Sequence, residues 1–305
     1  MLRRHAIALF LMSGFISHSL SVCSQSNNNG RNEIQGSLQR SLNFFSKTAN
    51  ENISYSIYFP PDYYQTTDSF PVFYLLHGLG GDENSLINDL SIHRIADSLI
   101  CDHAIPSMIM VMPNGKRSYF INDYLEGFPY ETIFIKEFIP TIDSLYRTKS
   151  TKPFRVIGGL SMGGFGALIN GFRNPGYFAA AVGLSAAIRT DSMIINEKTD
   201  KYSQVFKPLF GDSIQQFSHI TQHWEDNNPL YLTVRQPDTL RTVGWYLDCG
   251  LYDYLLPGNE ALHHLFIHYK IPHEYHVRTG NHDRAYFKSA LVPALLYTGR
   301  IIRGD

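Results

Sequence analysis

The stretch "RVIGGLSMGGFGALINGF", residues 155–172, places Ser161 between glycines at the point where an apolar run gives way to a helical pattern. A short apolar run, a tight turn and a helix in this order are typical of an α/β protein, in which helices cover a parallel sheet. Two interpretations of the turn are open. Either it presents Ser161 as a nucleophile, or its glycines only allow the strand and the helix to pack closely.

The Gly-x-Ser-x-Gly spacing of this turn matches what a catalytic serine requires when it lies between a strand and a helix. Such a turn is strained, and the residues two before and two after the serine approach each other closely. Gly159 and Gly163 occupy these two positions and are small enough for them. The N–H of Met162, at the start of the helix, would then face negative charge developing on a substrate oxygen. A phosphate-binding loop is disfavoured because no Gly-Lys-Ser/Thr sequence follows.

A second glycine-rich turn, "HGLGG" at residues 77–81, also follows an apolar run. In hydrolases with a serine on this kind of turn, the loop after an earlier strand supplies the second backbone N–H for the oxyanion. Its position assigns that donor to Leu79. We expect His77 to brace the turn rather than to transfer protons.

The order of a catalytic triad along such a chain is serine, then an acid after a late strand, then a histidine near the end. Asp253, three residues past the strand-like "GWYLDCG", is preferred as the acid over Asp248, which lies inside that run. His282, in the turn "TGNHD", is preferred as the base because a turn at a strand end can hold an imidazole over the sheet. His273 and His276 belong to the preceding strand and are expected to be packing or surface residues.

The rest of the chain alternates between apolar runs and helical patterns. "NISYSIYF", residues 52–59, alternates strictly and predicts an antiparallel strand. Nearly continuous apolar runs predict buried parallel strands at residues 71–78, 107–115, 154–160, 178–185, 242–250 and 273–280. Helical patterns lie between them at residues 91–100, 130–146, 164–172, 259–269 and 283–297. Pro140 predicts a kink or a break near residues 136–140. The long polar and aromatic stretch at about 186–241 predicts a lid or side insertion after the sixth strand.

Four segments together, "LLHGLGG", "GGLSMGGFGAL", "CGLYD" and "GNHDRAYF", resemble the esterase D family of α/β-hydrolases from about residue 50 to residue 300. That family includes formylglutathione hydrolases, tributyrin-type esterases, secreted feruloyl and acetylxylan esterases, and mycolyl-transferring relatives. The resemblance implies an α/β-hydrolase fold: a mostly parallel central sheet with antiparallel N-terminal strands and helices on both faces. It also implies Ser161 as nucleophile, Asp253 as acid and His282 as base, in agreement with the chain order.

The substrate is less well indicated. The last motif departs from the family's "GGHDW", because Asn281 replaces a glycine and Arg284 a tryptophan, which leaves the leaving-group side of the site open. Four aromatic side chains are candidates for stacking on a sugar or phenolic ring: Tyr119, Tyr124, Tyr130 and Trp224.

The first residues have the pattern of a targeting segment. Two arginines precede an apolar stretch too short to span a bilayer, and small and polar residues follow it. We therefore expect a signal peptide over residues 1–24, a flexible polar leader over 25–35, and a single domain over 36–305. The protein is therefore expected to be periplasmic or extracellular, and lipid attachment at Cys23, which would make it a lipoprotein, is the alternative to simple cleavage.

Composition narrows the classes of partner. The 305 residues are 44% hydrophobic and 17% charged, which suits a folded protein with a large core. Loss of residues 1–24 would leave 24 basic and 27 acidic residues, a net charge of −3, which gives no reason to expect nucleic acid or anionic lipid as a partner. Cys249 lies in an apolar run and is expected to be a buried thiol. We expect no metal or organic cofactor, since the histidines at 263, 264 and 268 have no acidic or cysteine companions.

These observations predict an exported serine esterase that removes acetyl or feruloyl groups from plant polysaccharide or oligosaccharide. Two enzymatic alternatives are a general short-chain carboxylesterase and a thioesterase similar to formylglutathione hydrolase. A non-catalytic surface binding protein on a hydrolase scaffold is the alternative from another class.

Overall fold

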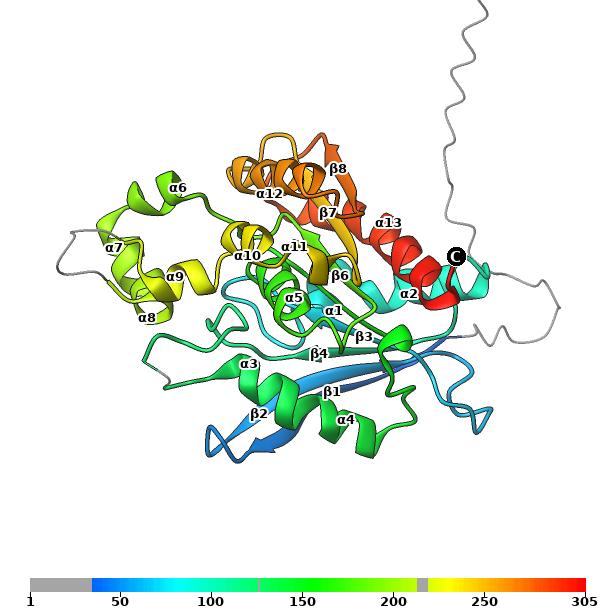
Figure 1. The fold of residues 1–305 in the computed structure, drawn as a ribbon. Helices are drawn as coiled ribbons and strands as arrows, with labels where there is room; N and C mark the ends of the chain where they lie inside the picture. Colours follow the sequence, from blue (N-terminus) through cyan, green and yellow to red (C-terminus); the bar gives the residue numbers. More distant parts are fainter. Residues whose placement is uncertain (1–34, 126, 213–218) are drawn as a thin grey trace, which may run out of the picture.

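The computed structural model describes residues 35–125, 127–212 and 219–305 (Figure 1). The expected signal peptide, Cys23 and nearly all of the expected leader lie outside these residues. Within the described residues, no helix has the length and hydropathy needed to cross a bilayer.

An eight-stranded sheet forms the centre of the molecule, in the order β1-β2-β4-β3-β5-β6-β7-β8. β1 pairs antiparallel with β2, and β2 pairs antiparallel with β4, whereas all the other neighbours are parallel. The strands are β1 (Ser37–Ser46), β2 (Glu51–Phe59), β3 (Val72–Leu76), β4 (Ile109–Pro113), β5 (Arg155–Leu160), β6 (Ala180–Leu184), β7 (Gly244–Gly250) and β8 (Glu274–Arg278). The fold class is as predicted, including antiparallel N-terminal strands, although no residue range had been assigned to β1.

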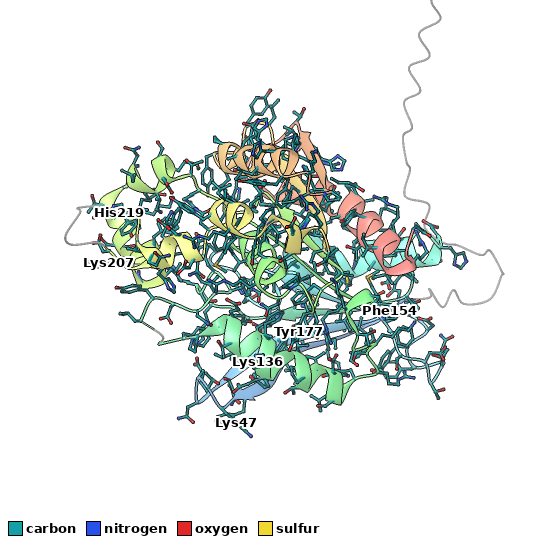
Figure 2. All side chains as sticks on the ribbon, viewed as in Figure 1. Lys47, Lys136, Phe154, Tyr177, Lys207 and His219 are labelled. Carbon is teal, nitrogen blue, oxygen red and sulfur yellow. The ribbon has the colours of Figure 1, made fainter. Side chains whose placement is uncertain are left out.

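Helices cover both faces of this sheet (Figure 1). One face packs against α3 (Tyr130–Ile133), α4 (Ile139–Leu145), α5 (Met162–Arg173) and α12 (Leu256–His268). The other face packs against α1 (Ser85–Leu90), α2 (Ile92–Cys101) and α13 (Arg284–Arg303). Side chains fill the space between the layers (Figure 2). Strands β3 to β7 are buried on both sides, which explains why their sequences are nearly continuous apolar runs rather than alternating ones. The edge strands β1 and β8 are only partly buried, so the expected burial of the strand at 273–280 is wrong.

The expected interruption near Pro140 takes the form of a π-helical turn, η1 (Phe134–Phe138), between α3 and α4. Pro140 lies in the first turn of α4, directly after this π-turn. The backbone stays helical on both sides of the junction, and the wider π-turn is the irregularity that accompanies the proline.

The predicted insertion at about 186–241 lies between β6 and β7 and is largely helical. Its elements are α6 (Asp191–Ile195), α7 (Thr199–Lys201), the π-turn η3 (Tyr202–Phe206), α8 (Lys207–Phe210), α9 (Gln222–Asp226), α10 (Pro229–Arg235) and α11 (Pro237–Leu240). Helices α6, α7, α8 and α9 lie at the left end of the molecule in Figure 1. They are short and several begin at proline or polar caps, so they carry little of the periodicity by which longer helices are recognised.

Candidate active site

Ser161 lies at the turn between β5 and α5, as predicted. Its backbone has φ 56° and ψ −117°, a region that a residue with a side chain rarely adopts. Its N–H donates to the carbonyl of Leu184 at the end of β6, at 2.9 Å. The surrounding sheet therefore holds the serine in a strained conformation, which is the usual setting of a functional residue.

The two glycines flanking the turn are required by its geometry. A Cβ placed on Gly159 would lie 2.5 Å from the carbonyl carbon of Gly163, and one placed on Gly163 would lie 2.1 Å from the carbonyl oxygen of Leu76. Both contacts are with backbone, so no side-chain rotation could relieve them. The two interpretations of this turn therefore do not exclude each other. The glycines allow the strand and the helix to pack closely, and the same turn presents Ser161.

Tertiary structure brings Ser161, His282 and Asp253 into one hydrogen-bonded chain. His282 Nε2 lies 2.8 Å from Ser161 Oγ, and His282 Nδ1 lies 2.7 Å from Asp253 Oδ2. His282 comes from the turn between β8 and α13, and Asp253 from the turn after β7. These two turns are tied together because the N–H of Tyr252 donates to the carbonyl of Gly280, at 2.9 Å.

The ionisation of Asp253 suits this arrangement. Burial raises the pKa of its carboxyl, but hydrogen bonds from His282 and from the N–H of Leu255 outweigh burial and hold the pKa below its usual range. The Leu255 bond, at 2.9 Å, occupies Oδ1 and leaves Oδ2 facing the imidazole. A carboxylate in this position fixes the imidazole with its proton on Nδ1 and stabilises the imidazolium.

Asp248, the alternative acid, points elsewhere. It is fully buried, and its carboxylate accepts hydrogen bonds from Tyr286 at 2.7 Å, Arg278 Nε at 2.6 Å and Tyr246 at 3.0 Å. These groups hold β7 against β8 and α13. Asp248 is therefore part of the protein's framework and has no contact with His282.

The expected oxyanion donors lie beside the serine. A Cβ on Gly78 would lie 3.7 Å from Ser161 Cβ, so the turn that carries Leu79 passes directly next to the nucleophile. The N–H groups of Leu79 and Met162 donate to no backbone carbonyl within the described ranges. Both N–H groups therefore keep a free donor, and their role in binding a substrate oxygen stays a prediction.

His77 does brace the turn, as expected. The N–H of Gly115 donates to its Nε2 at 2.9 Å, and its Nδ1 lies 2.8 Å from the carbonyl oxygen of Gly78. Burial lowers the pKa of the imidazole. A neutral ring with the proton on Nδ1 satisfies both contacts and joins the loop after β4 to the loop after β3.

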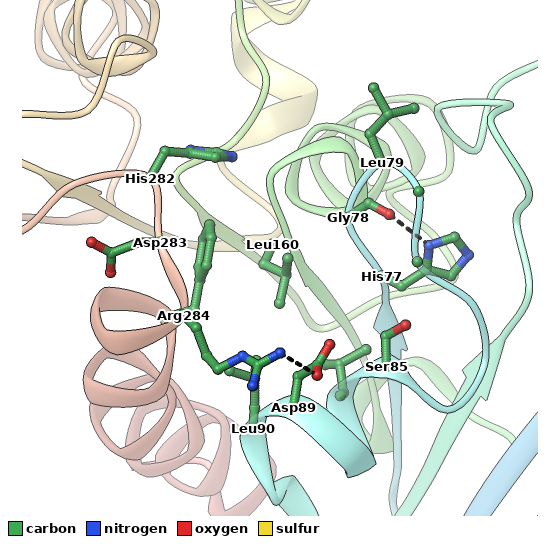
Figure 3. Close-up of a pocket in the computed structure, with 14 residues that line it drawn as sticks. His77, Gly78, Leu79, Ser85, Asp89, Leu90, Leu160, His282, Asp283 and Arg284 are labelled. Atoms are coloured by element: carbon green, nitrogen blue, oxygen red, sulfur yellow. Dashed lines mark hydrogen bonds and ion pairs between the residues drawn. The ribbon is translucent and has the colours of Figure 1, made fainter.

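A cavity of about 310 Å³ opens between the loop of Leu79 and the turn of His282 (Figure 3). Its walls include apolar side chains of Leu79, Leu160 and Phe287. Arg284 and Asp89 form an ion pair at 2.6 Å, with both side chains largely exposed. Arg284, at which the chain departs from the family motif, therefore lines the same cavity as His282, with its guanidinium directed toward Asp89 (Figure 3).

Three of the four aromatic residues proposed to stack on substrate are wrong for that role. Tyr119 is 3% exposed, and Tyr130 and Trp224 are each 2% exposed. Their rings pack in the core, Tyr130 against Phe120 among others, because large aromatic side chains contribute most when fully buried. Tyr124 is 48% exposed, but its ring packs on His223 of the insertion and has no recorded contact with the triad.

Tyr254 is the aromatic residue that the structure places at the site instead. It is 57% exposed, and its ring lies 5.1 Å from that of His282. It directly follows Asp253, and this adjacency was the signal by which it could have been found.

The cysteine and histidine side chains considered from the sequence lie in packed or paired positions outside the hydrogen-bonded chain of Ser161. Cys249 is a free, buried thiol. His263 Nδ1 lies 2.8 Å from His273 Nε2, so His263 pairs with another side chain. Among the described residues, no group of three or more His, Cys, Asp or Glu side chains is placed to hold a metal ion.

Comparisons with known proteins agree with this geometry. The model of the Esterase family matches residues 46–298. An endo-1,4-β-xylanase/feruloyl esterase of Xylanibacter ruminicola is 32% identical over 174 residues, which cover 55% of this chain and 24% of that protein. The chain thus spans about a quarter of that relative's length.

Three further matches cover nearly the whole of the related protein. An acetyl esterase of Caldicellulosiruptor saccharolyticus is 23% identical over 85% of this chain and 97% of its own length. The solved structure of a ferulic acid esterase has a TM-score of 0.74 and 28% identity, covering 88% of this chain and 99% of its own. An S-formylglutathione hydrolase of Staphylococcus aureus, 20% identical with a TM-score of 0.64 over 87% of this chain and 97% of its own, shares the fold. With its eight-stranded α/β-hydrolase sheet and a family match that spans most of its length, this chain belongs to the Esterase family of carboxylic ester hydrolases.

Proposed function

We propose that this protein is an exported serine esterase that works through an acyl-enzyme on Ser161 and releases acetyl or feruloyl groups from plant polysaccharide or oligosaccharide. The observation that carries the mechanism is the unbroken chain of hydrogen bonds from Ser161 through His282 to Asp253 at a strained strand-to-helix turn. A serine, an imidazole and a buried carboxylate in this order are sufficient for acyl transfer without a cofactor.

In the first half-reaction, His282 Nε2 takes the proton of Ser161 Oγ as Oγ attacks the ester carbonyl carbon. The carbonyl oxygen becomes negatively charged, and the N–H groups of Leu79 and Met162 donate to it. Loss of one such donor typically costs about 3–4 kcal/mol of barrier. The bond to the alcohol oxygen then breaks, and His282 returns the proton to that oxygen as the alcohol leaves.

In the second half-reaction, water enters where the alcohol was. His282 removes one of its protons, the resulting hydroxide attacks the acyl carbon, and the Ser161 Oγ–carbon bond breaks. The imidazolium returns its proton to Oγ, so that free enzyme and a carboxylic acid are formed. Asp253 stays ionised throughout and stabilises the imidazolium.

The acyl group is proposed from the size of the cavity and from the named relatives. A volume of about 310 Å³ is near the lower end of ligand cavities and gives room for an acetyl group or one substituted aromatic ring. The matched proteins are named for feruloyl and acetyl ester hydrolysis. Export rests on the expected signal peptide, and analysis of the mature N-terminus and of Cys23 lipidation would test it.

The proposal is tested with a panel of acetylated xylan, methyl ferulate, a simple butyrate ester and S-formylglutathione. Preferred release of acetate or ferulate supports the proposal, whereas equal or faster turnover of the butyrate ester or the thioester would replace the substrate assignment. A fluorophosphonate probe should label Ser161, and Ser161→Ala should abolish both labelling and turnover while keeping the fold. A folded parent protein that forms no adduct would favour the binding-protein alternative.

A further inference from the structure

Arg284 and Asp89 line the cavity beside His282, and the mechanism above uses neither of them. Arg284 is the first residue of α13 and Asp89 lies in α1, so the two side chains come from different helices. Arg284 Nη2 lies 2.6 Å from Asp89 Oδ1, and Figure 3 shows the guanidinium directed toward the carboxylate. The pair therefore forms a charged part of the cavity wall, two residues along the chain from the catalytic imidazole.

Both side chains keep hydrogen-bonding capacity beyond this contact. The side chain of Arg284 is 69% exposed and that of Asp89 is 47% exposed. Among the described residues, the contact between them is the one hydrogen bond that either side chain makes. A guanidinium has five N–H donors, and a carboxylate has two acceptor oxygens. The pair can therefore offer a donor and an acceptor to a molecule in the cavity while its own contact stays intact.

Apart from the catalytic imidazole, the other polar side chains of the cavity lining already have partners. Asp283 caps α13, because its Oδ1 accepts a hydrogen bond from the N–H of Tyr286 at 2.9 Å. The hydroxyl of Ser85 donates to Asp82 at 3.0 Å, and both ring nitrogens of His77 are engaged by backbone. The free donors and acceptors of the cavity are thus concentrated in the ion pair.

Helix stability does not explain an arginine at this position. The N-terminus of a helix carries partial positive charge, so a cation in the first turn of α13 is disfavoured. An ion pair as exposed as this one contributes little to stability. Residues that break a local preference are found mostly at functional sites. Arg284 is also the position at which the chain departs from the tryptophan of the family motif.

The remaining walls of the cavity are mainly apolar and suit a ring. Leu86, Leu90 and Phe287 are buried, and their side chains line the cavity together with Leu79 and Leu160. The volume of about 310 Å³ gives room for one six-membered ring. A sugar or a phenol has an apolar face and hydroxyl groups at its edge, and a hydroxyl both donates and accepts hydrogen bonds. Such a ring matches the apolar walls and the ion pair at the same time.

We propose that Arg284 and Asp89 bind hydroxyl groups of a six-membered ring held in this cavity, so that the enzyme prefers esters of hydroxylated rings over esters of equally large apolar rings. This inference rests on the proposed esterase function and names a substrate class for it. The ring belongs either to a phenolic acyl group or to the sugar that carries the ester. Both sources present the same chemistry to the pair, and the two arms of the experiment distinguish them.

The test uses two matched pairs of esters, one for each source of the ring. For the acyl group, methyl 4-hydroxycinnamate is compared with methyl 4-methylcinnamate. For the alcohol, methyl 6-O-acetyl-α-D-glucopyranoside is compared with cyclohexylmethyl acetate. The measured quantity is the ratio of kcat/KM for the hydroxylated ester to kcat/KM for the apolar ester. Comparing this ratio between the parent enzyme and its variants cancels the intrinsic reactivities of the esters.

Variants then locate the effect. Arg284→Met keeps an unbranched side chain but removes the N–H donors, and Asp89→Leu removes the acceptors at similar volume. Hydrogen bonds to charged groups are the stronger class, so each variant should lower the ratio by about tenfold in at least one of the two pairs. Both side chains are exposed, so both variants should fold, and urea unfolding checks this.

Arg300→Met is the matched control. Arg300 lies in the same helix and pairs with Glu274 at 2.6 Å, and its side chain is 44% exposed. It does not line the cavity beside His282. This variant should leave both ratios and the activity unchanged, because it removes a similar exposed ion pair away from the cavity.

The outcomes separate the two proposals. A fall in the ratio of the cinnamate pair identifies a phenolic acyl group, and a fall in the ratio of the acetate pair identifies a sugar. If the parent enzyme hydrolyses these esters but folded Arg284→Met and Asp89→Leu leave both ratios unchanged, hydroxyl binding by the pair is refuted and the esterase function stands. An equal fall in Arg300→Met also refutes it. If the folded parent protein hydrolyses none of the four esters, the proposed function itself fails.

Discussion

Gly163→Ala tests whether the serine turn and the oxyanion loop form one rigid unit. Gly163 lies in the first turn of α5, and its backbone touches the end of β3. An added Cβ would lie 2.1 Å from the carbonyl oxygen of Leu76 and 2.7 Å from that of His77. Ordinary contact begins at about 3.4 Å, so β3 and α5 would have to separate by more than 1 Å. Because Leu76 and His77 lead into the loop of Leu79, this movement would pull the oxyanion donor away from Ser161.

The size of the effect follows from two opposing terms. Alanine in place of glycine favours a helix by about 1 kcal/mol. Overpacking against immovable neighbours costs about 1–3 kcal/mol or more, and here both neighbours are backbone, so the upper part of that range applies. We expect a net loss of about 1–2 kcal/mol in the free energy of unfolding. A 1 Å misplacement of catalytic groups typically costs about 100-fold in rate, so kcat/KM should fall by roughly that factor.

Urea unfolding and hydrolysis of a simple ester measure the two effects. Gly176→Ala is the matched control, because a Cβ there meets nothing within 4 Å of the described structure. That variant should stay within about 0.5 kcal/mol of the parent in stability, with unchanged kcat/KM. If Gly163→Ala behaved like the control, the close approach of the two turns would be incorrect, and the assignment of Leu79 as an oxyanion donor would lose its support.

Three further predictions concern groups around the triad. Asp253→Asn should lower kcat by about 10⁴-fold with the fold intact. Asp248→Asn should mainly lower the free energy of unfolding, by about 3 kcal/mol, because it removes the buried charge partner of Arg278. Steady-state kinetics and urea unfolding of both variants check this, and a larger rate loss in a folded Asp248→Asn would reverse the assignment. The pKa of Asp253 is lower in the folded protein, so its ionised form contributes stability above about pH 3.9, the pKa of an unfolded Asp. This contribution should disappear as the pH falls through the folded pKa. Acid unfolding of the parent protein and of Asp253→Asn tests this, and an identical pH dependence of the two would contradict it. Burial raises the pKa of Cys249 to about 12, so a thiol reagent should modify it only in urea, and rapid labelling of the native enzyme would show that β7 is more open than described.

Local patterns predicted much of the fold and singled out the three residues that the structure joins in one hydrogen-bonded chain. Parallel strands buried on both faces need continuous apolar runs, and these runs could be recognised one at a time. The turn around Ser161 has a steric requirement that only glycines at 159 and 163 meet, so it too is visible in a short segment. Chain order then placed Asp253 and His282, because each follows a strand that ends at the same edge of the sheet.

The features that could not be predicted depend on how segments pack against one another. Tyr130 and Trp224 looked like possible stacking surfaces, yet packing buries them, and no short pattern distinguishes a buried tyrosine from an exposed one. β1 was missed because it is an edge strand whose first residues alternate irregularly around a bulge between Gln39 and Leu42. The short helices of the insertion depend on tertiary packing rather than on their own propensity.

The sequence by itself therefore determined the type of sheet and the strained serine turn, and it selected Ser161, Asp253 and His282 as the three residues of the predicted triad, because each of these depends on a few neighbouring residues or on their order. Only the tertiary structure decided that Asp248 belongs to the framework, that His77 joins two loops, and that the ring of Tyr254 lies beside that of His282. Those assignments depend on contacts between residues that are distant in the chain, since burial and hydrogen-bond partners are properties of the packed molecule and not of any single segment.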